Sequence, residues 1–250
     1  MLNTIHHGTP SPTPLIIAHG LYGSARNWGV ISKRLSDTRY VIAVDMRNHG
    51  ASDWTKTHSY NDLAEDLAEV IAPYGQADVL GHSMGGKAAM MLALTAPERV
   101  NRLIVGDIAP VAYTHSQMPM LEAMRGVDLS VVRKRSDAAE QLGALGVEPA
   151  LQSFFTQSLD IKNAKWLLNL DTLAEEMPKI MDFPDISTSF PNRTLFLTGA
   201  ESDYVQPKDR PRIRELFPAA RFVKLKDAGH WLHADQPRGF EAAVRAFLDA

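Results

Sequence analysis

The sequence predicts an α/β fold: a mostly parallel central sheet with helices on both faces and a helical cap inserted between strands. Three observations predict it. Strand-like and helix-like segments alternate along most of the chain, which is typical of parallel sheets with helical connections. The 250 residues are 45% hydrophobic, enough for one large core. Between about residues 110 and 190 the strand signal disappears and helical stretches replace it.

Strands are expected where short apolar runs end at glycine or polar residues. The expected strands are residues 14–18, 40–44, 77–80, 103–105, 194–197 and 221–225. Few residues precede the first of them, so any N-terminal hairpin must be short. Helices are expected at residues 28–35, 59–72, 87–95 and 238–248. In the second, apolar residues recur at helical spacing, and Ser59 with Asp62 is expected to form a capping pair at its start.

The segment without strands divides the chain into a core, residues 1–109 and 191–250, and a cap, residues 110–190. Helices are expected in the cap at residues 129–142, 149–157 and 170–180. Ligands of open α/β sheets bind beyond the carboxyl ends of the strands, so we expect the cap to cover that edge. Phe154, Phe155 and Trp166 are candidates for lining an acyl pocket beneath it. The alternative is that these side chains pack inside the cap.

The most informative motif is Gly81-His82-Ser83-Met84-Gly85, of the form G-x-S-x-G. A strand-like run precedes it and a helix-like run follows it. This setting predicts a nucleophile elbow, a tight strand-to-helix turn that holds Ser83 in a strained conformation with its hydroxyl exposed. The alternative is an ordinary glycine-rich turn. A β-carbon at either glycine would crowd the neighbouring strand or helix.

A nucleophilic serine needs a base, and His230 follows the last predicted strand. A histidine downstream of the serine fits a known triad order of serine, acid and histidine. There it would accept the Ser83 proton and later deliver it to the leaving group. His233 is the competing candidate, which we interpret as a helix-start residue beside the site.

Two aspartates could orient the histidine, and the pattern of the residues leaves both open. Asp203 follows a predicted strand that ends in glycine, just before the histidine segment. Asp107 ends the strand that follows the nucleophile helix, next to the nucleophile strand. The alternative role for either aspartate is capping a helix.

The oxyanion hole is expected from two backbone N–H groups. The apolar strand that ends in His19-Gly20 should place the N–H of Leu21 opposite that of Met84. His19 itself is expected to be structural, because this motif uses backbone donors. The remaining candidates for the substrate pocket are His19, Gly20, Tyr22, His82 and Trp231. Lys87, on the nucleophile helix, is expected to be solvated or salt-bridged.

Composition excludes several function classes. The net charge is −3 and no basic block occurs, which argues against nucleic acid as a partner. Without cysteine there can be no disulfide and no thiolate metal site. No signal peptide and no apolar run of bilayer length is evident, so we expect a cytoplasmic enzyme that does not bind membranes. We expect no cofactor and no metal, and a monomer or homodimer acting on a small-molecule ester.

Five motifs carry a resemblance to a known family that extends over nearly the whole chain. They are residues 19–24 (HGLYGS), 45–52 (DMRNHGAS), 81–87 (GHSMGGK), 107–111 (DIAPV) and 228–233 (AGHWLH). The chain resembles α/β-hydrolases, and more narrowly the YbfF-type esterases of that superfamily. The resemblance implies a serine carboxylesterase that forms an acyl-enzyme from small to medium acyl esters, with acyl thioesters as a further candidate class. Because esterases of this type can use the aspartate matching Asp107, the resemblance favours Asp107 over Asp203.

Other activities share the same triad. Acyl-CoA thioesterases, perhydrolases and C–C bond hydrolases are alternatives, because the cap decides the substrate. A serine nucleophile argues against dehalogenases and epoxide hydrolases of this fold, which need a carboxylate. A remote alternative is a non-catalytic ligand receptor or scaffold that retains the fold.

Overall fold

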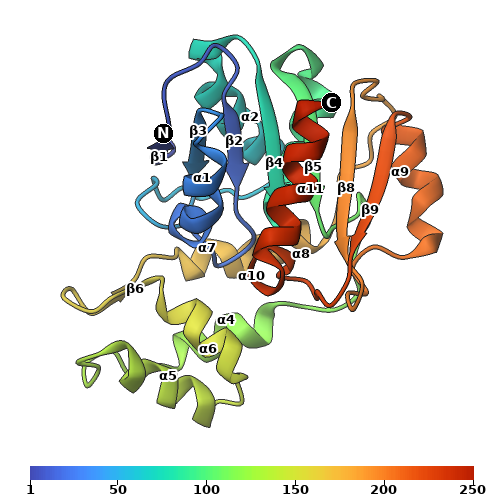
Figure 1. The fold of residues 1–250 in the computed structure, drawn as a ribbon. Helices are drawn as coiled ribbons and strands as arrows, with labels where there is room; N and C mark the ends of the chain where they lie inside the picture. Colours follow the sequence, from blue (N-terminus) through green and yellow to red (C-terminus); the bar gives the residue numbers. More distant parts are fainter.

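The computed structural model describes residues 1–250 and contains one seven-stranded sheet with helices on both faces (Figure 1). The strand order is β1-β3-β2-β4-β5-β8-β9, and only β1 runs antiparallel to its neighbour. The predicted α/β fold is therefore confirmed. The strands are β1 (Thr4–His7), β2 (Leu15–Ala18), β3 (Val41–Val44), β4 (Ala77–His82), β5 (Val100–Gly106), β8 (Thr194–Gly199) and β9 (Ala220–Leu225).

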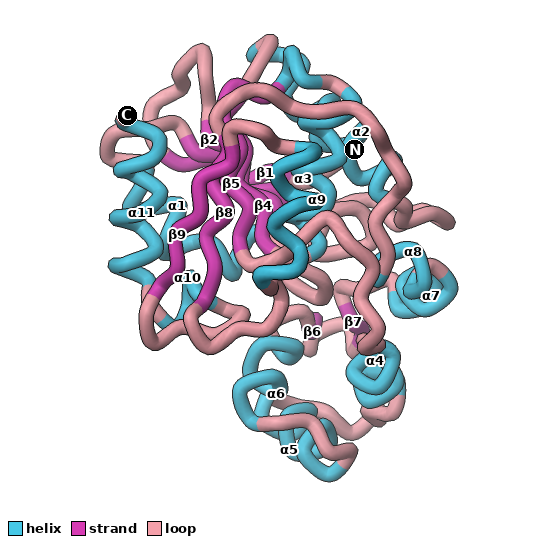
Figure 2. The backbone as a smooth tube through the Cα atoms, turned by 90° about the vertical axis from the view of Figure 1, so that its right-hand side faces the viewer, coloured by secondary structure: helices cyan, strands magenta, loops and turns pink.

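The sheet separates two apolar cores, because successive side chains of a strand point to opposite faces. In β2, for example, Ile16 and Ala18 belong to the larger core and Leu15 and Ile17 to the smaller one. The larger core lies beneath α2 (Tyr60–Ile71), α3 (Met84–Thr95) and α9 (Arg210–Leu216). The smaller core lies beneath α1 (Gly29–Leu35), α10 (Leu232–Asp235) and α11 (Pro237–Asp249). Figure 2 shows these two helical layers on either side of the sheet.

Local signals explain where several helices begin. Ser59 caps α2, and its side chain and that of Asp62 bond reciprocally to each other's backbone N–H, as predicted. A short 3-10 turn, Ala25–Trp28, leads into α1, so that helix begins one residue later than expected. The helix α3 begins directly after Ser83, three residues earlier than expected, because the elbow turn ends at Ser83 itself.

The segment between β5 and β8 holds five helices and a two-stranded hairpin. They are α4 (Met118–Arg125), α5 (Arg135–Ala144), α6 (Pro149–Thr156), α7 (Leu170–Glu175), α8 (Met177–Met181) and the strands β6 (Leu159–Asp160) and β7 (Lys165–Trp166). The expected helix 129–142 begins late, because Asp137 accepts the backbone N–H groups of Arg133 and Lys134 and starts a helix there. The expected helix 170–180 is two helices, with Pro178 in the first turn of the second.

This helical segment lies beyond the carboxyl ends of the central strands, below the sheet in Figure 1. Backbone bonds attach it to the loop after β3. The N–H of Gly50 donates to the carbonyl of Leu167 at 2.7 Å, and that of Asn169 donates to the carbonyl of Asn48 at 2.9 Å. None of the helices in the structure combines the length and the hydropathy that a membrane span requires.

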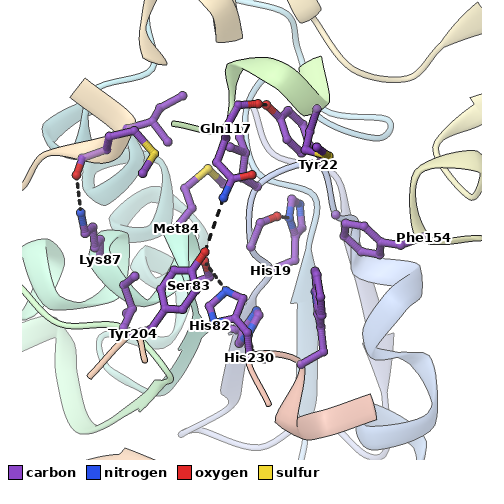
Figure 3. A pocket seen from close by; sticks show the side chains of 18 of the residues that line it. His19, Tyr22, His82, Ser83, Met84, Lys87, Gln117, Phe154, Tyr204 and His230 are labelled. Carbon is purple, nitrogen blue, oxygen red and sulfur yellow. Dashed lines mark hydrogen bonds between the residues drawn. The ribbon is translucent and has the colours of Figure 1, made fainter. Parts of the chain in front are cut away.

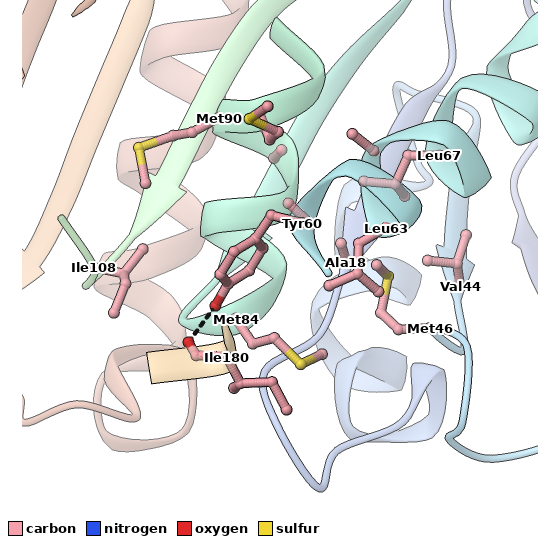
Figure 4. Close-up of a cluster of buried hydrophobic side chains, with 14 of the residues drawn as sticks. Ala18, Val44, Met46, Tyr60, Leu63, Leu67, Met84, Met90, Ile108 and Ile180 are labelled. Carbon is pink, nitrogen blue, oxygen red and sulfur yellow. Dashed lines mark hydrogen bonds between the residues drawn. The ribbon is translucent and has the colours of Figure 1, made fainter. Parts of the chain in front are cut away.

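Helix α3 packs close to the sheet at its start, with apolar side chains around it that belong to the larger core (Figure 4). A β-carbon added at Gly81 would lie 2.1 Å from the carbonyl oxygen of Gly85, and one added at Gly85 would lie 2.4 Å from that of Ala18. Both obstacles are backbone atoms that cannot rotate away. Glycine is therefore required at the two positions that flank the elbow.

We expect Gly81→Ala to destabilise the protein by at least about 3 kcal/mol, because the added methyl overlaps backbone and forces α3 away from β4. Gly29→Ala is the matched control, since a β-carbon there meets nothing within 4 Å. The control should be neutral or stabilising by up to about 1 kcal/mol. Urea unfolding of both variants measures this, and equal stabilities would contradict the steric account.

Candidate active site

Ser83 occupies the turn between β4 and α3 with φ of 52° and ψ of −120°. Such a left-handed backbone is strained for a residue with a side chain. The turn is held by the Ser83 N–H, which donates to the carbonyl of Gly106 on the neighbouring strand at 2.9 Å. The hydroxyl lies at the wall of the main pocket (Figure 3). The structure thus has the strained strand-to-helix turn that the motif predicts.

His230 lies on the loop between β9 and α10, beside Ser83. Its Nε2 is 3.1 Å from the Ser83 Oγ, and its Nδ1 is 2.8 Å from the Oδ2 of Asp107. The His82 Nε2–H donates to the His230 carbonyl at 2.8 Å and fixes the backbone of the loop. The geometry therefore leaves Nε2 facing the serine and Nδ1 facing the acid.

Asp107 directly follows β5 and is fully buried, with a φ of 48° that turns its carboxylate toward the His230 loop. Its Oδ1 accepts the N–H of Gly199 at 3.1 Å, and its Oδ2 accepts the hydroxyl of Ser202 as well as the imidazole. Three donors thus hold the carboxylate in one orientation. This satisfies the buried charge without any cationic side chain.

Asp203 lies outside this arrangement. Its side chain is exposed, and no hydrogen bond or ion pair of its carboxylate is found. Its neighbour Ser202 points inward to Asp107 instead. Of the two aspartates left open by the sequence, the structure brings Asp107 to His230.

His233 is not within reach of the serine. Its ring stacks on Trp28 with centroids 4.1 Å apart and an interplanar angle of 14°. Burial lowers the pKa of His233 to about 3, and its Nδ1 has no hydrogen-bond partner. The neutral, packed imidazole of His233 therefore has a structural role beside His82.

Leu21 and Met84, the two expected sources of oxyanion donors, both line the pocket. Met84 is the first residue of α3, where the backbone N–H has no partner within the helix, and the Leu21 N–H bonds to no protein atom. Two buried histidines hold the loop that carries Leu21. The His19 Nδ1–H donates to the Gly20 carbonyl at 2.8 Å while its Nε2 accepts the N–H of Met46, and the His49 Nε2 accepts the N–H of Tyr22 at 3.1 Å.

Burial lowers the pKa of both His19 and His49, so both imidazoles are neutral and can accept these bonds. Tyr22 itself has a φ of 63°. This gives His19 a structural function in the loop, in addition to its place at the pocket wall.

The pocket has a volume of about 400 Å³ and lies between the core and the helical segment. Seven predicted residues line it: His19, Gly20, Tyr22, His82, Phe154, Phe155 and Trp231. The prediction that Trp166 lines it is wrong. The Trp166 side chain is buried in the helical segment, and its indole N–H donates to the carbonyl of Met124 at 2.9 Å. A buried indole N–H needs such an acceptor, and Trp166 finds it inside the helical segment.

Lys87 corrects another expectation, because it is neither solvated nor salt-bridged. It is 1% exposed, lines the pocket and donates to the carbonyls of Met181 and Asp182 at 3.2 and 2.6 Å. Its ammonium also lies 4.7 Å from the ring centroid of Tyr113. Burial lowers the pKa of Lys87 to about 7. The apolar residues on every face of α3 are the sequence signal that predicts this burial.

Sequence reasoning missed several further pocket residues, three of which matter most for the position of the histidine. They are Tyr113 and Gln117 from the helical segment and Tyr204 from the loop after β8. Tyr204 stacks on His230, and nothing in its sequence context indicates that contact. No group of three or more His, Asp or Glu side chains is arranged to bind a metal ion.

Comparisons with known proteins agree with this architecture. A profile of the Alpha/beta hydrolase family matches residues 15–243. The sn-1-specific diacylglycerol lipase ABHD11 of Mus musculus is 39% identical over 248 residues, covering 94% of this chain and 80% of that protein. The esterase YbfF of Escherichia coli K12 is 33% identical over 241 residues, covering 95% and 93%. Among solved structures, a marine microorganism esterase has a TM-score of 0.93 and 36% identity, covering 98% of each chain.

The family predicted from the sequence motifs is confirmed by these matches, which extend over most of the chain and over most of each relative. The sheet order, the elbow and the histidine loop are the parts of the structure that correspond to it. The chain belongs to the alpha/beta hydrolase family.

Proposed function

We propose that this protein is a serine carboxylesterase. Ser83 is the nucleophile, His230 is the general base, and Asp107 is the carboxylate that orients His230. The observation that carries the proposal is the continuous series of hydrogen bonds from Asp107 through His230 to Ser83, which ends at an apolar pocket. A serine, a histidine and a buried carboxylate in this order form a general device for activating a hydroxyl group. The relatives named esterase and lipase support the same reaction class.

In the proposed reaction, the Ser83 oxygen attacks the ester carbonyl carbon while its proton passes to His230 Nε2. Negative charge collects on the carbonyl oxygen, where the N–H groups of Leu21 and Met84 would donate to it. The alcohol departs with the proton held by His230, leaving an acyl-enzyme. Water then attacks the acyl carbon by the same route, which releases the acid and restores the serine. Asp107 stabilises the imidazolium in both steps.

The size and lining of the pocket favour small to medium acyl groups. A volume of about 400 Å³ is near the lower end of the range for small-molecule sites. Phe154, Phe155 and Trp231 present aromatic surface to an acyl chain. Oxygen esters and thioesters fit the same chemistry, as do the peracid and C–C bond reactions of related triads, so the pocket alone does not choose between them.

Ser83→Ala tests the nucleophile. The variant should fold normally and lose at least about 10⁴-fold in kcat toward p-nitrophenyl butyrate, because no other hydroxyl is placed to form the acyl-enzyme. A fluorophosphonate probe should label the wild type at Ser83 and leave the variant unlabelled. Ser153→Ala, on the exposed face of α6, is the matched control and should retain full activity. Turnover by a folded Ser83→Ala protein would exclude the proposal and favour a different nucleophile. Absence of turnover by the wild type would favour a receptor or scaffold.

The assignment of the acid is tested by two isosteric substitutions. Asp107→Asn should lower kcat by about 10³- to 10⁴-fold, because an amide cannot stabilise the imidazolium and favours the wrong tautomer of His230. Asp203→Asn should change kcat by less than about twofold, because its exposed carboxylate contacts nothing in the site. Circular dichroism and thermal unfolding check that both variants fold. The reverse ranking would assign the role to Asp203.

Substrate class is tested with an acyl-chain series, C2 to C16, measured as p-nitrophenyl esters and as CoA thioesters. We expect kcat/KM to be highest between C2 and C8 and to fall for longer chains, which exceed a pocket of this volume. Oxygen esters should exceed thioesters of equal length, because the similar proteins are named as esterases and a lipase. Preference for thioesters would assign the chain to thioesterases, and strong activation on emulsified triglyceride would indicate a lipase.

A further inference from the structure

Tyr204 lies face to face with the imidazole of His230. The two ring centroids are 3.7 Å apart and the rings are inclined by only 17°. Tyr204 belongs to the loop after β8, two residues beyond Ser202, and it also lines the pocket. Figure 3 shows its ring beside Ser83 and His230, below Gln117.

A short stretch of the helical segment, residues 113–117, holds Tyr204 in this position. The Tyr113 hydroxyl donates to the Tyr204 carbonyl at 2.7 Å. The Tyr204 hydroxyl is 3.2 Å from His115 Nε2, and Gln117 Nε2 donates to it at 3.4 Å. The rings of Tyr113 and His115 also pack against the Tyr204 ring, with centroids 5.4 and 5.3 Å away.

The same stretch contacts the opposite side of the site. The Tyr22 hydroxyl, from the loop that carries Leu21, donates to the Gln117 carbonyl at 3.0 Å. Residues 113–117 therefore contact the oxyanion loop directly and the histidine through Tyr204. A displacement of this stretch would disturb both.

The stacked ring has two physical effects on the histidine. It restricts rotation of the imidazole, so Nδ1 and Nε2 face Asp107 and Ser83 at the same time. In addition, the face of a phenol ring carries negative charge density, which attracts the imidazolium that forms when His230 takes a proton. Both effects stabilise the state in which the serine attacks.

We infer that Tyr204 is a positioning residue through which residues 113–117 of the helical segment control the orientation of His230. The inference rests on the proposed function of His230 as the base. It adds that the reactivity of Ser83 depends on the position of the helical segment over the sheet. Tyr204 is the residue through which that position affects His230.

The decisive comparison is Tyr204→Leu with Tyr204→Phe, measured with p-nitrophenyl butyrate and with the rate of fluorophosphonate labelling. Leucine removes the aromatic face, so kcat and the labelling rate should both fall about tenfold while KM changes by less than about threefold. Phenylalanine keeps the stack and should stay within about threefold of the wild type. Tyr74→Leu makes the same change on a half-buried tyrosine outside the pocket and should leave kcat within about twofold.

The pH profile separates positioning from mere structural support. In Tyr204→Leu, the acid limb of kcat/KM should move to lower pH by about half a pH unit, because the imidazolium loses the ring that stabilises it. In Tyr204→Phe the limb should not move. The other titratable groups near the imidazole are Asp107, His82, His115 and His233, and they are the same in both variants.

The role of residues 113–117 is tested with Tyr113→Phe, which keeps the ring and removes the hydroxyl that donates to the Tyr204 carbonyl and accepts the Ala109 N–H at 2.9 Å. It should lower kcat about threefold in the wild type and have no effect in Tyr204→Leu, because coupled residues are not additive. An unchanged kcat and acid limb in Tyr204→Leu would overturn the inference. If the losses in kcat caused by Tyr113→Phe and Tyr204→Leu were additive, the part of the inference that concerns residues 113–117 would be wrong. Either result leaves Ser83 labelled, whereas failure of the proposed function would leave it unlabelled.

Discussion

The close approach of helix α3 to the ends of β2 and β4 is the contact on which the rest of the site depends. Gly81 and Gly85 permit it, since any side chain at either position would overlap backbone. The approach forces Ser83 into its left-handed conformation and exposes the hydroxyl. It also brings the start of α3 close to the end of β2, because a β-carbon built on Gly85 would meet the carbonyls of Ala18 and His19. One packing contact therefore sets the positions of the serine and of both candidate oxyanion donors.

The sheet register places the acid beside the serine. His82 pairs with Gly106 in the parallel ladder of β4 and β5, so Ser83 and Asp107 each come one residue after a paired position. Both have positive φ angles, which turn the two side chains out of the ladder toward the histidine loop. The last residue of β8 contributes the Gly199 N–H, and the loop after β8 contributes the Ser202 hydroxyl, as donors to the carboxylate. Adjacent strands thus supply the two groups that must lie on either side of one imidazole.

Much of this arrangement follows from local sequence patterns. The elbow, the histidine loop and the cap of α2 depend on residues close together in the chain, and each lies where its pattern predicts. The choice between Asp107 and Asp203 does not follow from local patterns, because it depends on a backbone angle at Asp107 and on a hydrogen bond from Ser202. The contact of Trp166 with Met124 and that of Tyr204 with His230 join residues 42 and 26 positions apart, which no local pattern encodes. Lys87 was predictable from the apolar helix around it, since no face of α3 is left for solvent.

The strands that flank the helical segment are neighbours in the sheet, with Leu103 beside Thr194 and Gly106 beside Leu197. The chain between these two strands therefore begins and ends at adjacent points of the sheet. Closing a loop costs free energy that grows only with the logarithm of its length, so this segment can lengthen, shorten or be exchanged with little penalty to the sheet. Its first residue is Asp107. Replacing the segment that follows Asp107 with another would therefore change the residues that cover the pocket, while the register of every strand stayed the same.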